Sequence, residues 1–245
     1  MSEDHSRAVE RAFTQQAAAF EDPRLNRLFT TDSEWVFERL PLDSEDLLLE
    51  VAAGTGHVAR RLAPRVRAVV ALDATWAMLE QGRGAAPANV IFLQGDAGAL
   101  PFPDASFDVV LARFAVHHFE QPKVQLAEMR RCLRPGGRLA VADIVADTAA
   151  QPGEQDRLER LRDDSHARLL GVDELAGLVG DDVEIRHVER PLEPWLEQTE
   201  TSPDAAGEIR AALRSELGGG PATGFRPSER DGELWFTHSM ASVIG

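Results

Sequence analysis

The stretch Leu47–Ala63 reads LLLEVAAGTGHVARRLA and decides the fold of the chain. A short apolar run leads to Glu50, then Gly54 and Gly56 enclose a threonine, and an amphipathic segment follows up to Pro64. This order is typical of a buried strand, a tight turn and a helix. Glycines at the carboxyl end of a strand let a ligand approach the backbone closely, and the helix N-terminus behind them favours negative charge. The same turn also suits a strand–helix connection that holds no ligand.

The turn differs from two common phosphate-binding loops. Residues 54–59 read GTGHVA, so Ala59 stands where a dinucleotide fingerprint has its third glycine. No Gly-Lys-Ser/Thr sequence follows, so the segment is not a P-loop either. The turn by itself therefore gives no indication of a ligand held through a phosphate.

Apolar segments with the length of strands alternate with helical segments along the rest of the first half of the chain. Segments rich in Val, Leu and Ala without alternation are typical of parallel strands covered on both faces. The pattern predicts an α/β fold with a doubly wound, mostly parallel sheet. The predicted strands are Leu47–Val51, Ala68–Asp73, Val90–Gln94, Phe107–Arg113 and Arg138–Asp143, and the helices between them are Gly56–Ala63, Thr75–Arg83 and Lys123–Leu133.

The two ends of the chain show a looser pattern than the centre. Residues 7–20 and Ser33–Leu40 are predicted to form N-terminal helices that cover the sheet as a lid. We divide the chain into residues 1–44 as the lid, 45–150 as the ligand-binding core, and 151–245 as a part that completes a seven-stranded sheet and the substrate pocket. In that last part, helices are predicted at Glu154–Arg162 and Asp173–Val179, strands at Val183–Arg190 and Leu234–Ile244, and a helical insertion at Pro191–Gly220, where Ser202-Pro203 begins a helix.

Composition excludes several classes of protein. The formal charge of −15 argues against a nucleic-acid partner, because binding to phosphates requires a basic surface. No apolar run reaches transmembrane length, the N-terminus is charged, and the single cysteine, Cys132, cannot form an internal disulfide. We expect a soluble cytoplasmic protein without a membrane partner. No spacing of His, Cys and acidic residues indicates a metal site.

Three acidic residues end successive predicted strands beside the glycine turn. Asp73 lies 23 residues after Glu50, where a carboxylate can accept hydrogen bonds from both ribose hydroxyls; its alternative role is to cap the following helix. Asp96 follows the third strand, where it could accept an adenine amino group while the Ala97 amide faces a ring nitrogen. The alternative for Asp96 is an ordinary turn after Gly95.

These segments resemble the class I S-adenosylmethionine-dependent methyltransferases. Within that family they are most similar to the branch of the ubiquinone/menaquinone-biosynthesis methyltransferases and to small-molecule methyltransferases of bacterial secondary metabolism. The resemblance covers about residues 45–145. The segments that carry it, in the order of the family, are LLLEVAAGTG, VVALDAT, GDAGALPFPDASFDVV, RFAVHHF and EMRRCLRPGGRLAVAD.

The resemblance implies S-adenosyl-L-methionine as the cofactor and assigns residues to its parts. Glu50 and Arg113 would lie near the methionine end, and Asp73 would hold the ribose. The remaining cofactor-binding positions implied are Phe20 on the N-terminal helix, Ala52, Gly54 and Gly56 in the turn, Ala74 and Met78 beside the adenine, and Asp96 and Ala97 at its polar edge. The usual first glycine of the family is Ala52 in this chain.

Two neighbouring histidines are the candidate general bases. His117 and His118 follow the fourth predicted strand and Asp143 ends the fifth, so a histidine and a carboxylate would meet at the pocket and the carboxylate would orient the ring. Alternatively, a histidine there only packs in the loop, and proximity alone accelerates transfer. The segment that holds Arg162, Asp163 and His166 resembles a substrate-facing stretch of the family, which implies that Arg162 and His166 bind the substrate; the alternative is a solvated helix end with Ser165 as its cap.

We therefore expect an enzyme that transfers a methyl group from S-adenosylmethionine to an oxygen, nitrogen or carbon atom of a small organic molecule. A protein of the same fold that binds the cofactor without methylating, as a cyclase or a regulatory binder, is the alternative. The sequence leaves the oligomeric state open between monomer and homodimer.

Overall fold

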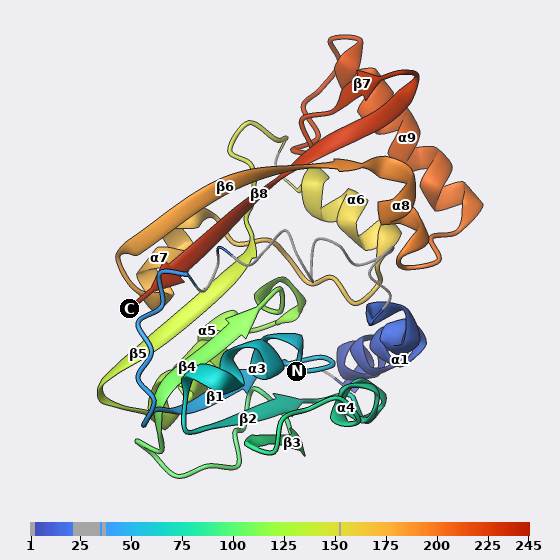
Figure 1. Ribbon diagram of the computed structural model, residues 1–245. Coiled ribbons are helices and arrows are strands. Elements are labelled where there is room, and N and C mark those ends of the chain that lie inside the picture. The colour runs from blue at the N-terminus through green and yellow to red at the C-terminus, as the bar shows by residue number, and fades with distance from the viewer. Residues whose placement is uncertain (1–2, 22–34, 36–37, 152) are drawn as a thin grey trace.

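The computed structural model describes residues 3–21, 35, 38–151 and 153–245 (Figure 1). The strands are β1 (Leu47–Val51), β2 (Ala68–Asp73), β3 (Val90–Gln94), β4 (Phe107–Arg113), β5 (Leu133–Ile144), β6 (Asp182–Pro191), β7 (Ser228–Arg230) and β8 (Glu233–Ile244). The helices are α1 (Glu3–Phe20), α3 (His57–Leu62), α4 (Trp76–Arg83), α5 (Pro122–Cys132), α6 (Glu154–Arg162), α7 (Val172–Val179), α8 (Leu192–Glu197) and α9 (Pro203–Leu217). Short 3-10 turns are η2 (Ala63–Arg65) and η3 (Val116–His118).

The strands form one mixed sheet in the order β3-β2-β1-β4-β5-β8-β6, with the short β7 paired to β8. The first five strands run parallel, and β8 is antiparallel to both β5 and β6. The expected doubly wound, mostly parallel fold is thus confirmed. The strand order reverses between β1 and β4, and ligands of such sheets bind at this switch point, outside the carboxyl ends of the strands.

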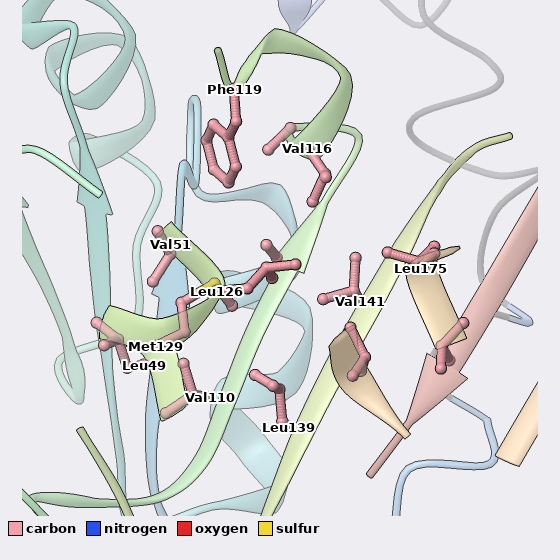
Figure 2. Close-up of a cluster of buried hydrophobic side chains, with 14 of the residues drawn as sticks. Leu49, Val51, Val110, Val116, Phe119, Leu126, Met129, Leu139, Val141 and Leu175 are labelled. Carbon is pink, nitrogen blue, oxygen red and sulfur yellow. The ribbon is translucent and has the colours of Figure 1, made fainter. Parts of the chain in front are cut away.

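Side chains that alternate along each strand build a separate core on each face of the sheet. On one face, Leu48 and Val109 pack with Val58 and Leu62 of α3. On the other face, the strand residues lie against α5 and α7, as Figure 2 shows for Leu126 and Met129 of α5 beside the neighbouring strand residues. Successive residues of a strand point to opposite faces, which is why near-continuous apolar runs are required where helices cover both.

A third apolar cluster lies outside the main sheet layers. The antiparallel pair of strands β6 and β8 extends past the end of β5. The far part of this pair is covered by α6, α8 and α9 (Figure 1). Trp195, Phe225 and Phe236 are the large, fully buried side chains of this cluster. Ser202 caps α9 by accepting a hydrogen bond from the Ala205 amide. The helical insertion therefore has a core of its own beside the sheet.

The structure differs from the predicted elements at a few boundaries. β5 begins at Leu133 rather than Arg138, because Leu133 pairs with Phe107 at the start of β4; the residues around Gly136, whose φ is +78°, form an irregularity before the regular register resumes at Arg138. The short β7 is an additional strand. Half of the helix expected at Ser33–Leu40 lies outside the described residues, namely Ser33, Glu34, Val36 and Phe37.

The glycine turn after β1 is held in a left-handed conformation at three alternate residues. The φ angles of Ala52, Gly54 and Gly56 are 54°, 57° and 71°. At Gly56 an added Cβ would stand 2.6 Å from the Phe92 ring, so Gly56 is required by packing as well as by its backbone angle. α4 presses on the same turn from outside: a Cβ at Gly82 would overlap the carbonyl group of Thr55.

The contact between α4 and the turn leads to a first prediction. Gly82→Ala should lower the free energy of unfolding by about 2 kcal/mol, because a methyl group must displace backbone rather than a flexible side chain. Gly84→Ala is the matched control, since nothing lies within 4 Å of its added Cβ. Urea unfolding of both variants measures the difference. Equal free energies of unfolding of the two variants would contradict this prediction, because they would show that the turn moves away from α4 without loss of stability.

Candidate active site

One cavity opens at the carboxyl ends of the parallel strands. It has a volume of about 840 Å³, including the open space at its mouth, and residues of β1, β2 and β4, the loop after β3, α1 and the η3 segment line it. Every predicted cofactor-binding residue except Gly56 lies on its wall. It lies at the switch point of the sheet, where ligands of doubly wound sheets bind.

Glu50 is a buried carboxyl group on this wall. Its Oε2 accepts a hydrogen bond from the Ala59 amide at 2.7 Å, in the first turn of α3. Burial raises its pKa to about 8, although the charge of Arg113 acts in the opposite direction. Burial likewise lowers the pKa of Arg113 to about 10. The free protein therefore holds Glu50 protonated at neutral pH, and a cationic ligand group would favour its ionised form.

Asp73 joins the glycine turn to the end of β2. Its Oδ2 accepts a hydrogen bond from the Gly54 amide at 2.7 Å, and its Oδ1 accepts one from the Thr75 amide at 2.8 Å. Burial raises the pKa of the Asp73 carboxyl, against the effect of these amides. Thr75, not Asp73, stands at the cap of α4. Each carboxylate oxygen has further lone pairs, and the residue lines the cavity.

The loop after β3 forms the next part of the wall. Asp96 Oδ1 accepts a hydrogen bond from the Gly98 amide at 2.8 Å, so the turn predicted as the alternative role of Asp96 exists, and Asp96 also lines the cavity. Opposite it, the Gln94 side chain donates to the carbonyl oxygen of Ala74 at 2.8 Å. Polar groups at the end of β3 thus hold both the loop after β3 and the loop after β2.

Aromatic side chains line the other end of the cavity. Phe13 and Phe20 come from α1, and Phe114 and Phe119 flank the η3 segment. The Phe13 ring lies edge-on to the His118 ring, with 5.0 Å between centroids. Phe114 has a φ of 50°, which is uncommon for a side chain of this size.

His117 and Asp143 form a buried ion pair behind the cavity wall. His117 Nδ1 lies 2.5 Å from Asp143 Oδ1. Asp143 also accepts hydrogen bonds from the amides of Val116 at 2.6 Å and Ile144 at 2.7 Å. Burial opposes both charges, yet the pairing raises the pKa of His117 and lowers that of Asp143. The predicted meeting of a histidine with Asp143 exists, but neither member of the pair lies on the cavity wall.

His118 is the histidine that lines the cavity, and a different carboxylate supports it. Its Nδ1 lies 3.0 Å from the Ser165 carbonyl oxygen and so donates to it, which leaves Nε2 as the acceptor nitrogen. The buried Ser165 hydroxyl donates to Asp163 Oδ1. Burial, together with the charge of the neighbouring His117, lowers the pKa of His118 to about 3. At neutral pH, His118 is therefore an uncharged imidazole.

Arg162 and His166 lie elsewhere than on the cavity wall. The Arg162 guanidinium stacks on the Trp195 ring at 4.6 Å and donates to the Trp195 carbonyl oxygen. His166 Nε2 lies 2.8 Å from Asp156 Oδ1, and its side chain is buried. Both side chains thus join α6 to its surroundings rather than lining the cavity, and the burial of His166 does not fit the solvated helix end considered as the alternative.

Several residues of the site carry no sequence signal of their own. Phe13, Phe119, Gln125, Ser165 and Asp163 reach the cavity or its histidine from segments far apart in the chain. The helical spacing of Phe13 and Phe20 placed both on one face of α1, which is the single pattern that could have identified Phe13 as a wall residue. Ser165 and Asp163 are adjacent to His118 only through the fold.

The chain is similar to known methyltransferases in sequence and in fold. A methyltransferase-domain family matches residues 49–141. The methyltransferase YcgJ of Bacillus subtilis, itself described as uncharacterized, is 32% identical over 177 residues, 68% of this chain and 70% of that protein. A demethylmenaquinone methyltransferase of Renibacterium salmoninarum is 46% identical over 101 residues, 41% of this chain and 42% of that enzyme. A Bacillus halodurans protein structure superposes with a TM-score of 0.77 at 25% identity, over 87% of this chain and 97% of that one.

The chain belongs to the class I S-adenosylmethionine-dependent methyltransferases. It is therefore an enzyme that transfers a methyl group from S-adenosylmethionine. The cavity fits the cofactor, because its wall residues with carboxyl or guanidinium groups are Glu50, Asp73, Asp96 and Arg113, and three carboxyl groups against one guanidinium suit a cationic ligand that favours their ionised form. At Gly54 an added Cβ would stand 3.1 Å from the Met78 methyl group, so only glycine leaves this part of the wall open.

The buried Glu50 carboxyl leads to a second prediction. In the folded protein the group stays protonated up to about pH 8, whereas its unperturbed pKa is 4.5. Because the folded state binds the extra proton, this group lowers the free energy of unfolding as pH rises from 4.5 to 8. Glu50→Gln keeps an oxygen for the Ala59 amide and removes the titration. We expect the variant to be more stable at pH 7, by on the order of 3 kcal/mol.

Urea unfolding at pH 5 and pH 7.5 checks this expectation. The advantage of Glu50→Gln should be small at pH 5 and large at pH 7.5. Glu80→Gln, an exposed substitution on α4, is the control and should show no such difference. An equal effect of Glu50→Gln at both pH values would mean that Glu50 is already ionised in the free protein.

Proposed function

We propose that the enzyme methylates a small, uncharged and largely apolar organic molecule that presents one protic group to His118. The observation that supports this most strongly is the division of the cavity wall. The charged residues belong to the ends of β1, β2 and β4 and to the loop after β3. The opposite end consists of Val9 and phenyl groups around a neutral imidazole. Such a surface favours an apolar ring and would leave a charged acceptor unpaired.

In this proposal the cofactor occupies the acidic end of the cavity. Glu50 would hold the methionine ammonium, Asp73 the ribose hydroxyls, and Asp96 with the Ala97 amide the polar edge of the adenine. S-adenosylmethionine supplies a methyl group bound to a positive sulfonium. The group that leaves is the neutral thioether S-adenosylhomocysteine, which needs no protonation. The amides that Asp73 already accepts hold its carboxylate in one orientation before any ligand arrives.

The protein contributes alignment and a proton acceptor. His118 Nε2 would accept a hydrogen bond from the protic group of the substrate, because Ser165 holds Nδ1 as the donor. Asp163 acts through Ser165 and not on the substrate, so both are positioning residues in this proposal. Good alignment alone corresponds to effective molarities of about 10⁵–10⁸ M, and a positioned proton acceptor adds about 10²–10⁴-fold. A weakly basic imidazole suits an acceptor group that loses its proton easily.

α1 would act as a lid that excludes water from the cavity. Contacts along its length hold it over the site: His5 Nε2 lies 2.7 Å from the His118 carbonyl oxygen, Arg11 pairs with Asp164, and Gln15 donates to Glu200. Val9 and Phe13, on the inner face of the same helix, contribute apolar surface to the cavity. A closed, dry site strengthens the electrostatic contacts inside it.

We also propose a biosynthetic role in the cytoplasm. Curated relatives are named for ubiquinone and menaquinone biosynthesis, which supports a small-molecule acceptor over a macromolecule. The one cysteine, Cys132, is buried and unpaired, as expected in a reducing compartment. Among the described residues, no helix is long and apolar enough to cross a membrane.

A third prediction tests the proposed place of the cofactor. Asp73→Ala should weaken binding of S-adenosylhomocysteine about tenfold or more, since hydrogen bonds to a charged group contribute about 1.5–3 kcal/mol each. Asp73→Asn keeps one oxygen and should fall between this variant and the wild type. Asp104→Ala, at an exposed turn, is the control. Titration calorimetry measures all four proteins. Unchanged affinity of Asp73→Ala would remove Asp73 from the ribose.

A fourth prediction tests the acceptor and His118. With cofactor labelled on its methyl group, the enzyme should label 1-naphthol at least tenfold faster than 1-hydroxy-2-naphthoate, because the apolar end of the cavity has no partner for a carboxylate. His118→Phe should lower turnover about hundredfold, the lower end of the contribution of a positioned proton acceptor. Affinity for S-adenosylhomocysteine should stay the same.

His187→Phe, a substitution in β6 away from the cavity, is the control for this experiment. Mass spectrometry of the product should show the gain of one methylene unit, which a cyclase would not produce. Faster labelling of the carboxylated compound would contradict the proposed acceptor class. Full turnover of His118→Phe would instead favour catalysis by proximity alone.

A further inference from the structure

Gln125 is a buried polar residue on the cavity wall that the methyl-transfer proposal leaves without a role. It lies in the first turns of α5, and its residue exposure is 1%. Its neighbours on the helix, Lys123 and Val124, are exposed, so the helix turns this carboxamide inward. The residue lines the cavity together with Asp96 and Ala97.

The carboxamide of Gln125 has an unmet hydrogen-bonding need. Its Oε1 is buried and has no partner among the described residues. Its Nε2 lies beside the loop after β3: a Cβ built on Gly98 would stand 3.8 Å from this nitrogen and 3.3 Å from Asp96 Oδ1. Burial of an amide without its hydrogen bonds is unfavourable, whereas an apolar side chain of similar size would carry no such cost. A polar residue at this position therefore points to a partner that is absent from the protein itself.

A purely structural role for Gln125 is poorly supported. The contact between α5 and the loop after β3 is made by two other residues. Glu128 Oε2 accepts from the Leu100 amide at 3.0 Å, and Arg131 donates to the carbonyl oxygens of Leu100 at 3.0 Å and Phe102 at 2.8 Å. This network holds the loop against the helix without any contribution from the Gln125 side chain.

The chemistry of a carboxamide identifies the kind of group that would satisfy it. A glutamine offers one acceptor and one donor side by side, which matches the amino group N6 and the ring nitrogen N7 on one edge of adenine. Adenine has two hydrogens on N6, so Asp96 can accept one on the N1 side while a second acceptor takes the other. The wall places Asp96 and the Gln125 carboxamide next to each other, and a half-turn of the terminal amide group about χ3 brings Oε1 to the side of Asp96, as this division requires.

We propose that Gln125 is a specificity residue for the cofactor and that its carboxamide pairs with the N6/N7 edge of the adenine. Oε1 accepts from N6, and Nε2 donates to N7. This inference rests on the proposed placement of the cofactor in this cavity. It adds a residue of α5 to a base-binding wall otherwise built by the loops after β2 and β3.

The experiment compares two ligands that differ at a single ring atom. S-adenosylhomocysteine and its 7-deaza analogue have the same charge and amino group, but the analogue has a C–H in place of N7. The wild type should bind the analogue about fivefold more weakly, as expected for one hydrogen bond. Gln125→Leu should bind both ligands with equal affinity, because nothing is left to contact N7. Titration calorimetry gives the four dissociation constants.

Two controls keep a folding defect apart from the loss of a contact. Gln121→Leu makes the same change on an exposed residue at the start of the same helix, where the side chain makes no capping hydrogen bond, and should keep the fivefold preference. Thermal unfolding of the free proteins should show Gln125→Leu to be at least as stable as the wild type, since it removes an unpaired buried oxygen. Gln125→Met, which is unbranched and of similar length, should behave as Gln125→Leu does.

Each result leads to a different conclusion. Loss of the preference in both Gln125 variants, with Gln121→Leu unchanged, supports the inference. Equal binding of the two ligands by the wild type, or a preference that survives in Gln125→Leu, overturns it and leaves the proposed function intact. Failure of the wild type to bind S-adenosylhomocysteine at all would overturn the placement of the cofactor and this inference with it.

Discussion

The site depends on the hydrogen bond from the Gly54 amide to Asp73. This contact joins the turn after β1 to the end of β2, and the second oxygen of the same carboxylate holds the Thr75 amide at the start of α4. The close approach of Gly82 to Thr55 presses the helix onto the turn. A charge-assisted hydrogen bond to a backbone amide is about twice as strong as a neutral one, so a single carboxylate can hold three segments in place. The same carboxylate then faces the cavity with its geometry already set.

The two adjacent histidines show how strongly the surroundings of a side chain change its pKa. His117 is paired with Asp143, and its pKa is raised although burial opposes its charge. His118, whose ring centroid lies 4.1 Å from that of His117, is kept neutral by burial and by this charge. Two like charges in contact within a protein interior repel strongly, so one ring holds the proton and the other does not. The His117 ring, paired with Asp143, supports the loop, and the neutral His118 ring is the one that lines the cavity.

Much of the fold could be predicted from the sequence because it follows from local patterns. Strands β1 to β4 begin and end at the predicted residues, since each is a nearly continuous apolar run with polar residues at one or both ends. The start of β5 could not be predicted, because its first residues pair with β4 only across an irregular register. The acidic wall was also predictable: parallel strands place Glu50, Asp73 and Asp96 at one edge of the sheet. The hydrogen-bond partner of each histidine could not be predicted from the sequence.

Sequence patterns could not assign Asp143 to His117 rather than to His118. That choice depends on the direction in which each ring leaves the η3 turn, and on Ser165, which meets His118 from a segment 47 residues away. The inward direction of Gln125 similarly follows from how α5 lies on the sheet. Predictions based on the spacing of residues along the sequence therefore succeed for helices and strands and for the residues at their ends. They fail where a side chain is satisfied by a distant segment.

Several residues on the wall of this cavity lower the stability of the ligand-free protein. Ala52 and Phe114 have positive φ angles that residues with a side chain rarely adopt. Glu50 is a carboxyl group whose pKa burial raises to about 8, and Gln125 holds a buried oxygen without a partner. Each reduces stability in the free protein, and each lies on the wall of the same cavity. A ligand that ionises Glu50 and satisfies Gln125 would recover part of this free energy on binding. A strained backbone and an unmet polar group on the wall of a binding cavity are what selection for binding, rather than for stability, would retain.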